Sequence, residues 1–327
     1  KGSWLAAMLK MQGNQVYGIS LNPLKYSHYE LANIKKFLNR DIRLDIRNSK
    51  SLIRTFRRIQ PDVILHLAAQ SLVRESYENP LYTYETNVIG TLNVLEATKE
   101  LKNLKAALII TTDKVYKNHN HLRGYVETDE LGGDDPYSAS KSMADIATQS
   151  WSTSFSKVPT AIARAGNVFG GGDFSEDRLI PDIMKELASN KAPKLRFPNS
   201  IRPWQHVIEP IYGYLLMAEA MHSKVTNLTA MNFGPLAENQ ITVEAIISFS
   251  REVLPSNYNL DEQLTPGKYK ESDYLLLDSE LAKSELGWEP LLSWKEAVSL
   301  SLDWYLDFQG GTSARELVDR DILFYLN

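Results

Sequence analysis

Three short, largely apolar runs, each followed by a helical pattern, constrain the fold of this chain more than any other feature. They are Pro61–Ala69, Ala106–Ile110 and Pro159–Ala165. A strand that is buried on both faces of a sheet reads as a nearly continuous apolar run, whereas a strand with one face in water alternates apolar and polar residues. We therefore predict an α/β protein with a Rossmann-type, doubly wound parallel sheet.

The regular alternation of strand and helix ends near Ala165, and we divide the chain there. We expect residues 1–165 to form a dinucleotide-binding Rossmann domain and residues 166–327 a smaller α+β domain for substrate. Some elements of residues 203–236 are expected to return to the first domain. A chain of 327 residues, 43% of them hydrophobic, can bury a core large enough for this arrangement. We expect a ligand cleft where the two domains meet.

Composition argues against several classes of function. The formal net charge of −4 argues against a nucleic-acid-binding surface, which would normally be basic. The chain has no cysteine, so it has neither disulfides nor thiol chemistry, and this fits a cytoplasmic protein. No apolar run is long enough to cross a bilayer. The six histidines are scattered without ligand spacing, so we expect no metal site.

The beginning of the sequence is unusual for an α/β domain. Residues Lys1–Lys10 have a helical pattern and Gln15–Ser20 the pattern of a strand, with no strand before the helix. The first strand of a doubly wound sheet is central. We therefore expect that the recorded chain begins after this strand and after most of a glycine-rich turn, with Gly2 as the last glycine of that turn. Such a glycine permits close packing of helix and strand; the alternative is an ordinary glycine near a chain start.

Two predicted strand ends offer contacts to a dinucleotide. Ser20 ends the strand after the first helix, and no acidic residue follows it to bind a ribose diol, so the sequence does not choose between NAD and NADP. Asp45 and Ile46 end a second predicted strand, Ile42–Ile46. Asp45 could hydrogen-bond the adenine of a cofactor, or it could equally cap the helix predicted over Ser49–Ile59.

The end of the first apolar run and the helix after it supply further candidates. Three residues that close this run are candidate cofactor contacts: Leu67, Ala68 and Ala69. The two alanines would let the backbone approach a cofactor closely, although tight helix packing explains them equally well. A long helix is predicted over Thr83–Leu101, and Thr86 on it is another candidate contact. The neighbouring Asn87 indicates a buried, structural hydrogen bond.

The most informative residues lie around the second apolar run. Thr112, Asp113 and Lys114 come at its carboxyl end, where open α/β sheets bind their ligands. Tyr137 and Lys141 are four residues apart in a helix that Asp135 caps and Pro136 begins, so both project from one helix face. A tyrosine beside an ammonium group has its phenolate favoured and can act as a base near neutral pH. The sequence therefore predicts a cluster of proton-transfer groups at one crevice.

These residues resemble a known superfamily. Tyr137-x-x-x-Lys141 with Thr112 upstream is similar to the extended short-chain dehydrogenases/reductases, and its register with Leu65–Ala69, Thr86 and Asn167 strengthens the match. Within that superfamily the chain resembles the nucleotide-sugar 4,6-dehydratases, and Asp113-Lys114 is similar to the version that acts on CDP-glucose. Five further segments carry the same resemblance: Lys1–Leu5, Leu131–Lys141, Gly166–Asp173, Asp177–Asp182 and Arg202–Pro210. Only the end of the family's glycine fingerprint is present.

The resemblance implies a tightly held NAD and assigns roles to the central residues. Tyr137 would take the proton of the sugar's 4-hydroxyl, Thr112 would bind the 4-oxygen, and Lys141 would hold the cofactor ribose and lower the pKa of Tyr137. Asp113 and Lys114 would eliminate water across C5 and C6. Transferred by position, Asp113 is the acid and Lys114, when neutral, the base. If Lys114 stays charged, the two roles could reverse.

The same resemblance gives substrate contacts and an assembly. Arginine presents a planar fork to phosphate, so we expect Arg178 and Arg202 to hold the diphosphate, although a lone arginine is more often a surface ion pair. Further contacts are expected from Asn167, Ser71 and Arg74, and His206 and Asp173 are weak candidates for the cytosine. Helices over Thr83–Leu101 and Tyr137–Ser154 imply a homodimer or a dimer of dimers. The implied pathway is deoxysugar synthesis for a surface polysaccharide.

Three other functions stay open at this point. A nucleotide-sugar 4-epimerase would keep Thr112, Tyr137 and Lys141 but would need no elimination pair. A dehydratase that acts on a dTDP- or GDP-sugar should have Asp-Glu where this chain has Asp113-Lys114. The last is a catalytically silent dinucleotide-binding protein, which has no reason to keep the proton-transfer groups.

Overall fold

The computed structural model describes residues 1–175, 178–188, 194–195, 198–224, 228–236, 241–255, 263–264 and 274–326. Its main sheet has four parallel strands in the order β10-β5-β4-β3. Their bounds are β3 (Val63–His66), β4 (Ala106–Ile110), β5 (Thr160–Ala165) and β10 (Ala230–Phe233). A second piece of parallel sheet pairs β1 (Tyr17–Ser20) with β2 (Arg40–Arg43). The predicted parallel α/β architecture is confirmed.

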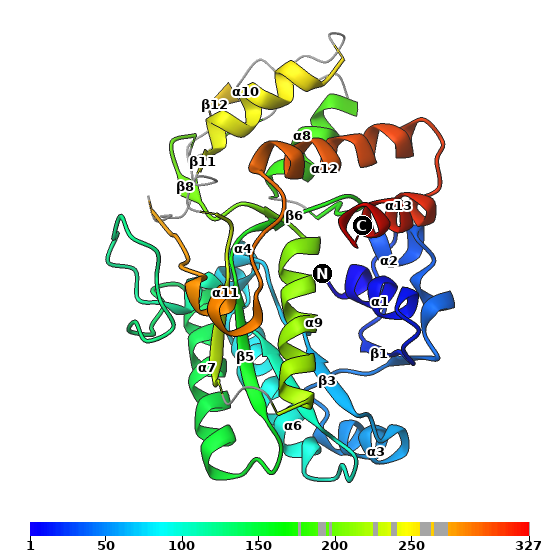
Figure 1. The fold of residues 1–327 in the computed structure, drawn as a ribbon, viewed down its shortest axis with the longest axis vertical. Coiled ribbons are helices and arrows are strands. Elements are labelled where there is room, and N and C mark those ends of the chain that lie inside the picture. The colour runs from blue at the N-terminus through cyan, green and yellow to red at the C-terminus, as the bar shows by residue number, and fades with distance from the viewer. Residues whose placement is uncertain are drawn as a thin grey trace.

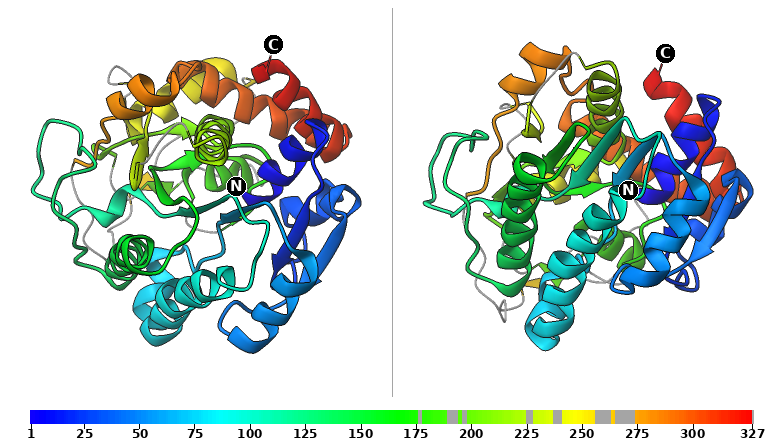
Figure 2. Two further views of the ribbon diagram at one scale, coloured as in Figure 1. Left: turned by 60° about the horizontal axis from the view of Figure 1, so that its bottom comes forward. Right: turned by 90° about the horizontal axis from the view of Figure 1, so that it is seen from below.

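Helices cover both faces of the main sheet (Figures 1 and 2). On one face lie α6 (Gly90–Thr98) and α7 (Pro136–Ser154), and on the other lies α9 (Ile208–His222). All residues of β4 and β5 are buried, as the unbroken apolar runs predict. Because β4 is central and rigid, the residues that follow its carboxyl end are held at a fixed place beside the start of α7.

The other elements around the sheet are short. They are α1 (Gly2–Met11), α2 (His28–Leu31), η1 (Ile34–Phe37), α3 (Ser49–Ile59), α4 (Val73–Glu78), α5 (Pro80–Tyr84), η2 (Glu85–Ile89), η3 (Asp113–Val115) and α11 (Glu280–Leu286). Two-residue strands form three small pairs: β6 (Val168–Phe169) with β9 (Gln205–His206), β8 (Ile201–Arg202) with β11 (Ile241–Thr242), and β7 (Lys194–Leu195) with β12 (Gln263–Leu264). The loop predicted over Asn167–Asp173 therefore contains β6.

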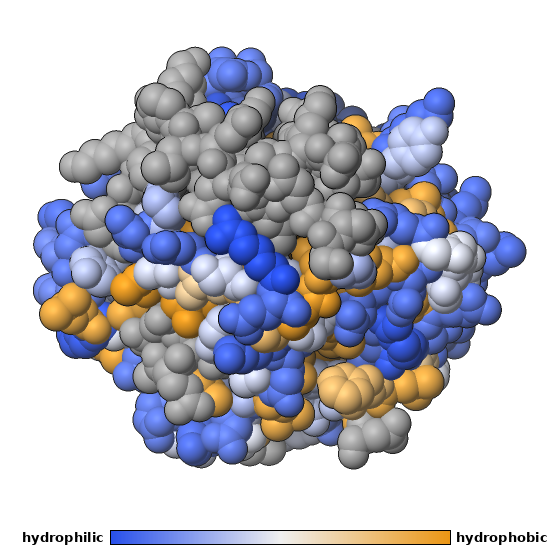
Figure 3. Space-filling view, turned by 90° about the horizontal axis from the view of Figure 1, so that it is seen from above, coloured by the Kyte–Doolittle hydropathy of each residue, from blue (hydrophilic) through white to orange (hydrophobic). Residues whose placement is uncertain are grey.

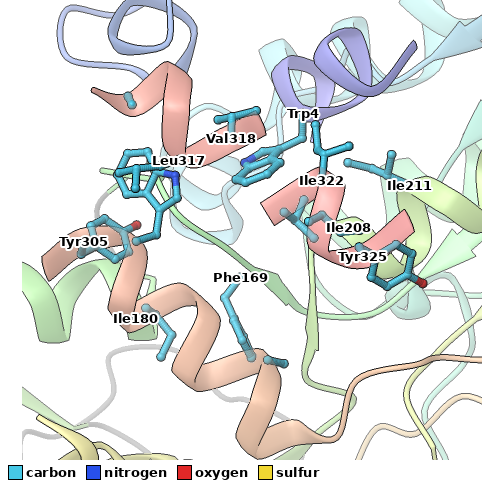
Figure 4. Packing of buried hydrophobic residues seen from close by; sticks show 14 of the residues in the cluster. Trp4, Phe169, Ile180, Ile208, Ile211, Tyr305, Leu317, Val318, Ile322 and Tyr325 are labelled. Atoms are coloured by element: carbon cyan, nitrogen blue, oxygen red, sulfur yellow. The ribbon is translucent and has the colours of Figure 1, made fainter. Parts of the chain in front are cut away.

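Four helices from the second half of the chain lie in the upper part of Figure 1: α8 (Leu179–Ala188), α10 (Val243–Val253), α12 (Trp294–Gln309) and α13 (Ala314–Leu326). A hydrophobic cluster joins this region to the first helix. In Figure 4, Trp4 of α1 lies near Ile322 and Val318 of α13 and Ile208 of α9. The cluster therefore links both ends of the described chain, and the domain boundary at residue 165 stays a prediction.

Several predicted boundaries were wrong. The helical spacing of residues 29–39 predicts one helix, but the structure interrupts it at Asn33, which has φ 50°, a left-handed conformation that asparagine tolerates better than most residues. The helix expected from Thr83 begins at Pro80 and contains the π-helical turn η2. Strand β2 lies earlier than predicted, so Asp45 and Ile46 follow it in the loop. Helix α13 was not predicted.

No helix in the part of the chain that the structure describes is long and apolar enough to cross a membrane. The face drawn in Figure 3 mixes hydrophilic residues with smaller hydrophobic areas. The large apolar side chains of the sheet are instead gathered beneath its helices.

Candidate active site

The site begins where β4 ends. Thr112 has an extended backbone and caps the 3-10 helix η3, accepting a hydrogen bond from the Lys114 amide at 3.4 Å. Its hydroxyl donates to Asp113 Oδ1 at 2.7 Å. This local capping turns the chain sharply, so Thr112, Asp113 and Lys114 stay together at the carboxyl end of the sheet.

Helix α7 brings the tyrosine and the lysine to the same place. Its predicted start is confirmed, because Asp135 Oδ1 accepts a hydrogen bond from the Ser138 amide at 2.9 Å and Pro136 occupies the first turn. The Tyr137 hydroxyl lies close enough to Thr112 for their side chains to interact. The predicted lowering of the Tyr137 pKa is wrong: burial of the hydroxyl raises this pKa to about 12, although the Thr112 side chain and the charge of Arg178 act in the opposite direction.

Close packing fixes the first turn of α7. A Cβ added to Gly133 would lie 2.4 Å from the Ser138 carbonyl carbon and 2.5 Å from the Ala139 amide. We therefore expect Gly133→Ala to displace Tyr137 and to lower kcat by about 100-fold, since a misplacement of about 1 Å at a reacting group can cost that much. Steady-state kinetics would measure the loss. Gly310→Ala is the matched control, because φ at Gly310 is −70° and suits alanine; equal losses in both variants would contradict the prediction.

Lys141 is anchored to the central strand. Its side chain is buried, and Nζ donates a hydrogen bond to the Ile110 carbonyl at 2.9 Å. Burial lowers the pKa of Lys141 to about 8; the charge of Lys1 acts in the same direction and that of Asp145 in the opposite one. The ammonium is therefore held between the end of β4 and the face of α7 that carries Tyr137.

Asp113 is an unusual carboxyl group. It is 1% exposed, and its Oδ2 has no hydrogen-bond partner among the described residues. Burial raises its pKa, while the Thr112 hydrogen bond and the nearby charges of Lys114, Arg202 and Lys1 lower it. A buried carboxyl with a free oxygen can carry a proton and give it to a bound molecule. Lys114 is only half-buried.

The predicted cofactor residues lie along the carboxyl edges of both sheet pieces. Ser20 ends β1, and its Oγ accepts a hydrogen bond from Arg43 at 2.6 Å. Asp45 is paired with Arg47 at 2.7 Å, and α3 is capped by Asn48, so the capping alternative for Asp45 is wrong. Ile46 is buried against Gly90, where a Cβ would meet its side chain at 2.5 Å.

The remaining cofactor candidates follow β3 and lie on the helix beside it. Leu67, Ala68 and Ala69 are half-buried in the segment that leads from β3. Thr86 lies in η2, and its buried hydroxyl has no partner among the described residues. An orphaned hydroxyl at this edge fits a bound dinucleotide. A Cβ on Gly2 would meet nothing within 4 Å, so the described contacts give this glycine no packing reason.

Asn87 has the structural role predicted for it. Its side-chain oxygen accepts from the Gln70 amide at 2.8 Å, and its Nδ2 donates to the Gln70 carbonyl at 2.9 Å and to Ser140 Oγ at 2.9 Å. These bonds tie the segment after β3 to α7. The hydrogen bonds of Asn87 thus hold the segment after β3, which contains the cofactor candidates Leu67, Ala68 and Ala69.

Two arginines surround the centre. Arg202 on β8 is buried, and its charge lowers the pKa of Asp113; Arg178, just before α8, lowers that of Tyr137. Both charges therefore act at the catalytic cluster. Asn167 lies half-buried between β5 and β6. Ser71 is exposed in the segment after β3, and Arg74 follows on α4.

The weak candidates for base recognition lie in different surroundings. His206 is fully buried beside the hydrophobic cluster, and its ring centroid lies 5.9 Å from that of Trp4. Asp173 is half-buried, and its carbonyl accepts a hydrogen bond from Tyr305 at 2.5 Å. Neither arrangement identifies a reader of cytosine.

Two groups near the centre were missed. Burial lowers the pKa of Lys1 to about 8, and the charge of Asp113 opposes this shift, so the amine acts on the catalytic cluster. The hydroxyl of Tyr214 on α9 is buried without a partner among the described residues. Burial raises the pKa of Tyr214, and the charges of Tyr137 and Asp113 raise it further. Neither residue belongs to a recognisable local pattern, so sequence spacing gave no signal.

Thr112, Tyr137 and Lys141 lie together at the carboxyl end of the parallel sheet, where such sheets bind ligands, and resemble the cluster of the short-chain dehydrogenases/reductases. The family model described as GDP-mannose 4,6 dehydratase matches residues 1–300, and the chain belongs to this family. The resemblance to nucleotide-sugar 4,6-dehydratases is thus confirmed.

Individual relatives are consistent with this family. The chain is 37% identical over 339 residues to CDP-glucose 4,6-dehydratase of Salmonella typhimurium, covering 100% of this chain and 93% of the relative. It is 30% identical to dTDP-glucose 4,6-dehydratase of the same species, over 80% and 77% of the two chains.

Solved structures share the fold. The UDP-glucose 4-epimerase of Thermotoga maritima, in complex with UDP-glucose, has a TM-score of 0.83 at 21% identity, covering 94% of this chain and 96% of the other. The dTDP-glucose 4,6-dehydratase of Bacillus anthracis, in complex with NAD, has a TM-score of 0.79 at 22% identity, covering 94% and 93%.

Proposed function

We propose that this protein is an NAD-dependent hydro-lyase that converts CDP-D-glucose to CDP-4-dehydro-6-deoxy-D-glucose and water. The observation that carries the proposal is the buried Asp113 with a free carboxyl oxygen, next to Lys114 and to the interacting side chains of Thr112 and Tyr137. An epimerase needs Thr112 and Tyr137 but has no use for Asp113 and Lys114. The whole-chain likeness to a CDP-glucose 4,6-dehydratase supports the choice of nucleotide.

The redox step at C4 falls to Tyr137, Thr112 and Lys141. Bound NAD supplies the acceptor for the hydride from C4 and later the donor of that hydride to C6. Tyr137 removes the proton of the 4-hydroxyl while Thr112 holds the 4-oxygen. Lys141 favours the phenolate of Tyr137 by its positive charge and binds the cofactor ribose. We expect the rest of the cofactor to be held by Gly2, Ser20, Asp45, Ile46, Leu67, Ala68, Ala69 and Thr86.

The elimination of water falls to Asp113 and Lys114. The new 4-ketone acidifies the hydrogen on C5, so Lys114 in its neutral form can remove it. Asp113 then protonates the departing 6-hydroxyl as it leaves as water, and the proton held by Lys114 returns to C5 when C6 receives the hydride. Burial raises the pKa of Asp113 and so favours the protonated form that this role needs. The reversed assignment requires an ionised Asp113, which burial disfavours.

The substrate's diphosphate is held by arginines on the other side of the cluster. Arg178 and Arg202 offer fork-shaped donors to phosphate oxygens, and both charges already act on the catalytic groups. Asn167, Ser71 and Arg74 add contacts to the nucleotide sugar. We further propose a cytoplasmic enzyme whose product feeds deoxysugar synthesis for a surface polysaccharide such as lipopolysaccharide O-antigen.

One assay separates the candidate functions. The protein is incubated with CDP-glucose and NAD, and the chromophore that 4-keto sugars give in base is measured. A signal with CDP-glucose but not with dTDP-glucose or a GDP-sugar supports the proposal. CDP-galactose without the chromophore would identify an epimerase. No turnover of any nucleotide sugar would identify a silent NAD-binding protein.

Exposed apolar side chains support a homodimer, or a dimer of dimers, formed through α5–α6 and α7. Leu81, Ile89, Met143 and Ile146 are 70%, 50%, 48% and 51% exposed. A cluster of exposed large apolar residues indicates an interaction surface. We expect the double variant Met143→Asp/Ile146→Asp to be a monomer by light scattering, because burying unpaired carboxylates costs several kcal/mol. Leu122→Asp is the control, because Leu122 is 77% exposed and lies outside these helices. An unchanged mass of the double variant would contradict this interface.

A further inference from the structure

A buried ion pair lies directly behind the catalytic residues. Asp145 is 0% exposed and follows Lys141 by four residues on α7, so Tyr137, Lys141 and Asp145 share one helix face. Arg164 on β5 is 1% exposed. Its Nε donates to Asp145 Oδ2 at 2.9 Å and its Nη2 to Oδ1 at 2.8 Å. The proposed reaction does not use either residue.

The pair also reaches the end of β4. Thr111 Oγ1 donates to Asp145 Oδ2 at 3.1 Å, and Thr111 directly precedes Thr112. One turn earlier on the helix, Lys141 Nζ donates to the Ile110 carbonyl at 2.9 Å. Two successive turns of α7 are therefore tied to the last residue of β4 and to the residue that follows it. Gln149 fills the remaining acceptor capacity of Asp145, donating to Oδ1 at 2.8 Å.

Arg164 is held on its other side as well. Its Nη1 donates to the Tyr116 hydroxyl at 2.8 Å and to the Glu127 carbonyl at 3.1 Å. The Tyr116 hydroxyl in turn donates to Asn232 Oδ1 at 2.7 Å. The guanidinium is thus fixed by β5, by the segment after β4 and by β10 together.

A buried ion pair is poorly suited to stabilising a fold. Removing two charges from water costs several kcal/mol for each, and well-packed apolar residues of the same volume are often as stable or more so. Fully satisfied buried networks instead fix one arrangement of the groups they join. The groups joined here are the carboxyl end of β4, which carries Thr112, and the helix face that carries Tyr137 and Lys141.

We propose that Asp145, oriented by Arg164, is a positioning residue that holds Lys141 and Thr112 in register for the redox step. The proposal rests on the proposed function for its catalytic consequence, but its structural content is independent of the substrate. Asp145 fixes the rotation and height of α7 against β4. It also places a negative charge one helical turn from the Lys141 ammonium.

Three groups act electrostatically with Lys141. Lys1 lies ahead of α1, His66 lies on β3, and Asp145 lies on the same helix as Lys141. Burial lowers the pKa of His66 to about 3, so this ring is neutral. Lys1 disfavours the ammonium, and Asp145 is the negative charge that favours it. Loss of the Asp145 charge should therefore let Lys141 give up its proton at a lower pH.

Asp145→Asn tests the proposal, because asparagine keeps the size of the side chain and an acceptor for Thr111. The pKa of Lys141 is read from the ¹³Cε signal of labelled lysine, assigned with Lys141→Arg, in the full chain. We expect the titration midpoint to fall by about one pH unit. In single turnovers with CDP-glucose, reduced cofactor should form about 10-fold more slowly at pH 8 and recover in part towards pH 6.

Tyr116→Phe is the matched control, since it cuts the same buried network on the side away from Lys141. It should lower the unfolding temperature and leave the Lys141 midpoint unchanged. Thr111→Val breaks only the link from Asp145 to β4. It should slow reduced-cofactor formation several-fold without moving the midpoint, and it carries the test if Asp145→Asn does not fold.

Two results would overturn the proposal. One is an unchanged Lys141 midpoint in folded Asp145→Asn. The other is a rate loss in Asp145→Asn that is the same at every pH and is matched by Tyr116→Phe, as a merely structural ion pair would give. A wild-type rate in Thr111→Val would also count against the proposal. If the unaltered protein does not turn over CDP-glucose, the proposed function fails, while the midpoint still decides whether Asp145 acts on Lys141.

Discussion

Lys114→Ala is expected to oxidise the sugar at C4 and then to stop. Reduced cofactor should still form, because Thr112, Tyr137 and Lys141 remain, but removal of the C5 hydrogen should slow by about 100-fold or more, the usual contribution of a general base. Stopped-flow absorbance at 340 nm follows the first step, and loss of deuterium from C5-labelled CDP-glucose to solvent follows the second. Reduced cofactor should accumulate instead of appearing only transiently.

Asp113→Asn separates the two roles. Asparagine keeps the Thr112 hydrogen bond at Oδ1, which is 2.7 Å long, but cannot give a proton to the leaving hydroxyl. With Asp113 as the acid, exchange at C5 continues while release of water falls. If Lys114→Ala exchanges C5 normally and Asp113→Asn does not, the carboxylate is the base and the roles are reversed.

Tyr137→Phe should have the largest effect on the first step. The hydroxyl removes the proton of the 4-hydroxyl, and a positioned general base contributes about 10²- to 10⁴-fold to a rate. Formation of reduced cofactor should fall by about that factor, with binding of NAD, measured by calorimetry, little changed. Because the Tyr137 side chain also meets Thr112, Thr112→Val is the companion variant, and its loss should be smaller. A near-normal rate in Tyr137→Phe would remove this residue from the reaction.

The parts of the site that could be predicted are those set by local chemistry. The start of α7 follows from Asp135, whose side chain caps the helix, and from Pro136, which begins it. The face shared by Tyr137 and Lys141 follows from their spacing alone. The place of Thr112 follows from an apolar run that only a buried central strand explains.

The parts that could not be predicted depend on contacts between distant segments. Asp145 gives no sign in the sequence that it is the partner of Arg164 in the predicted buried strand, and only the fold shows that they meet in the interior. Periodicity could not locate the left-handed Asn33 or the π-helical turn before Gly90, because one residue in an unusual conformation leaves the apolar pattern intact. Lys1 acts on Asp113 although the two residues are far apart in the sequence.

The strand order has a consequence for synthesis of the protein. Strand β10 lies beside β5, although α8, β8 and α9 come between them in the sequence. As the chain leaves the ribosome, β5 therefore has one unpaired edge until Phe233 has emerged, and an unpaired edge can pair with another chain. Such long-range parallel pairing forms slowly and leaves the nascent chain prone to aggregation. We expect the yield of folded protein to depend on chaperones during this interval.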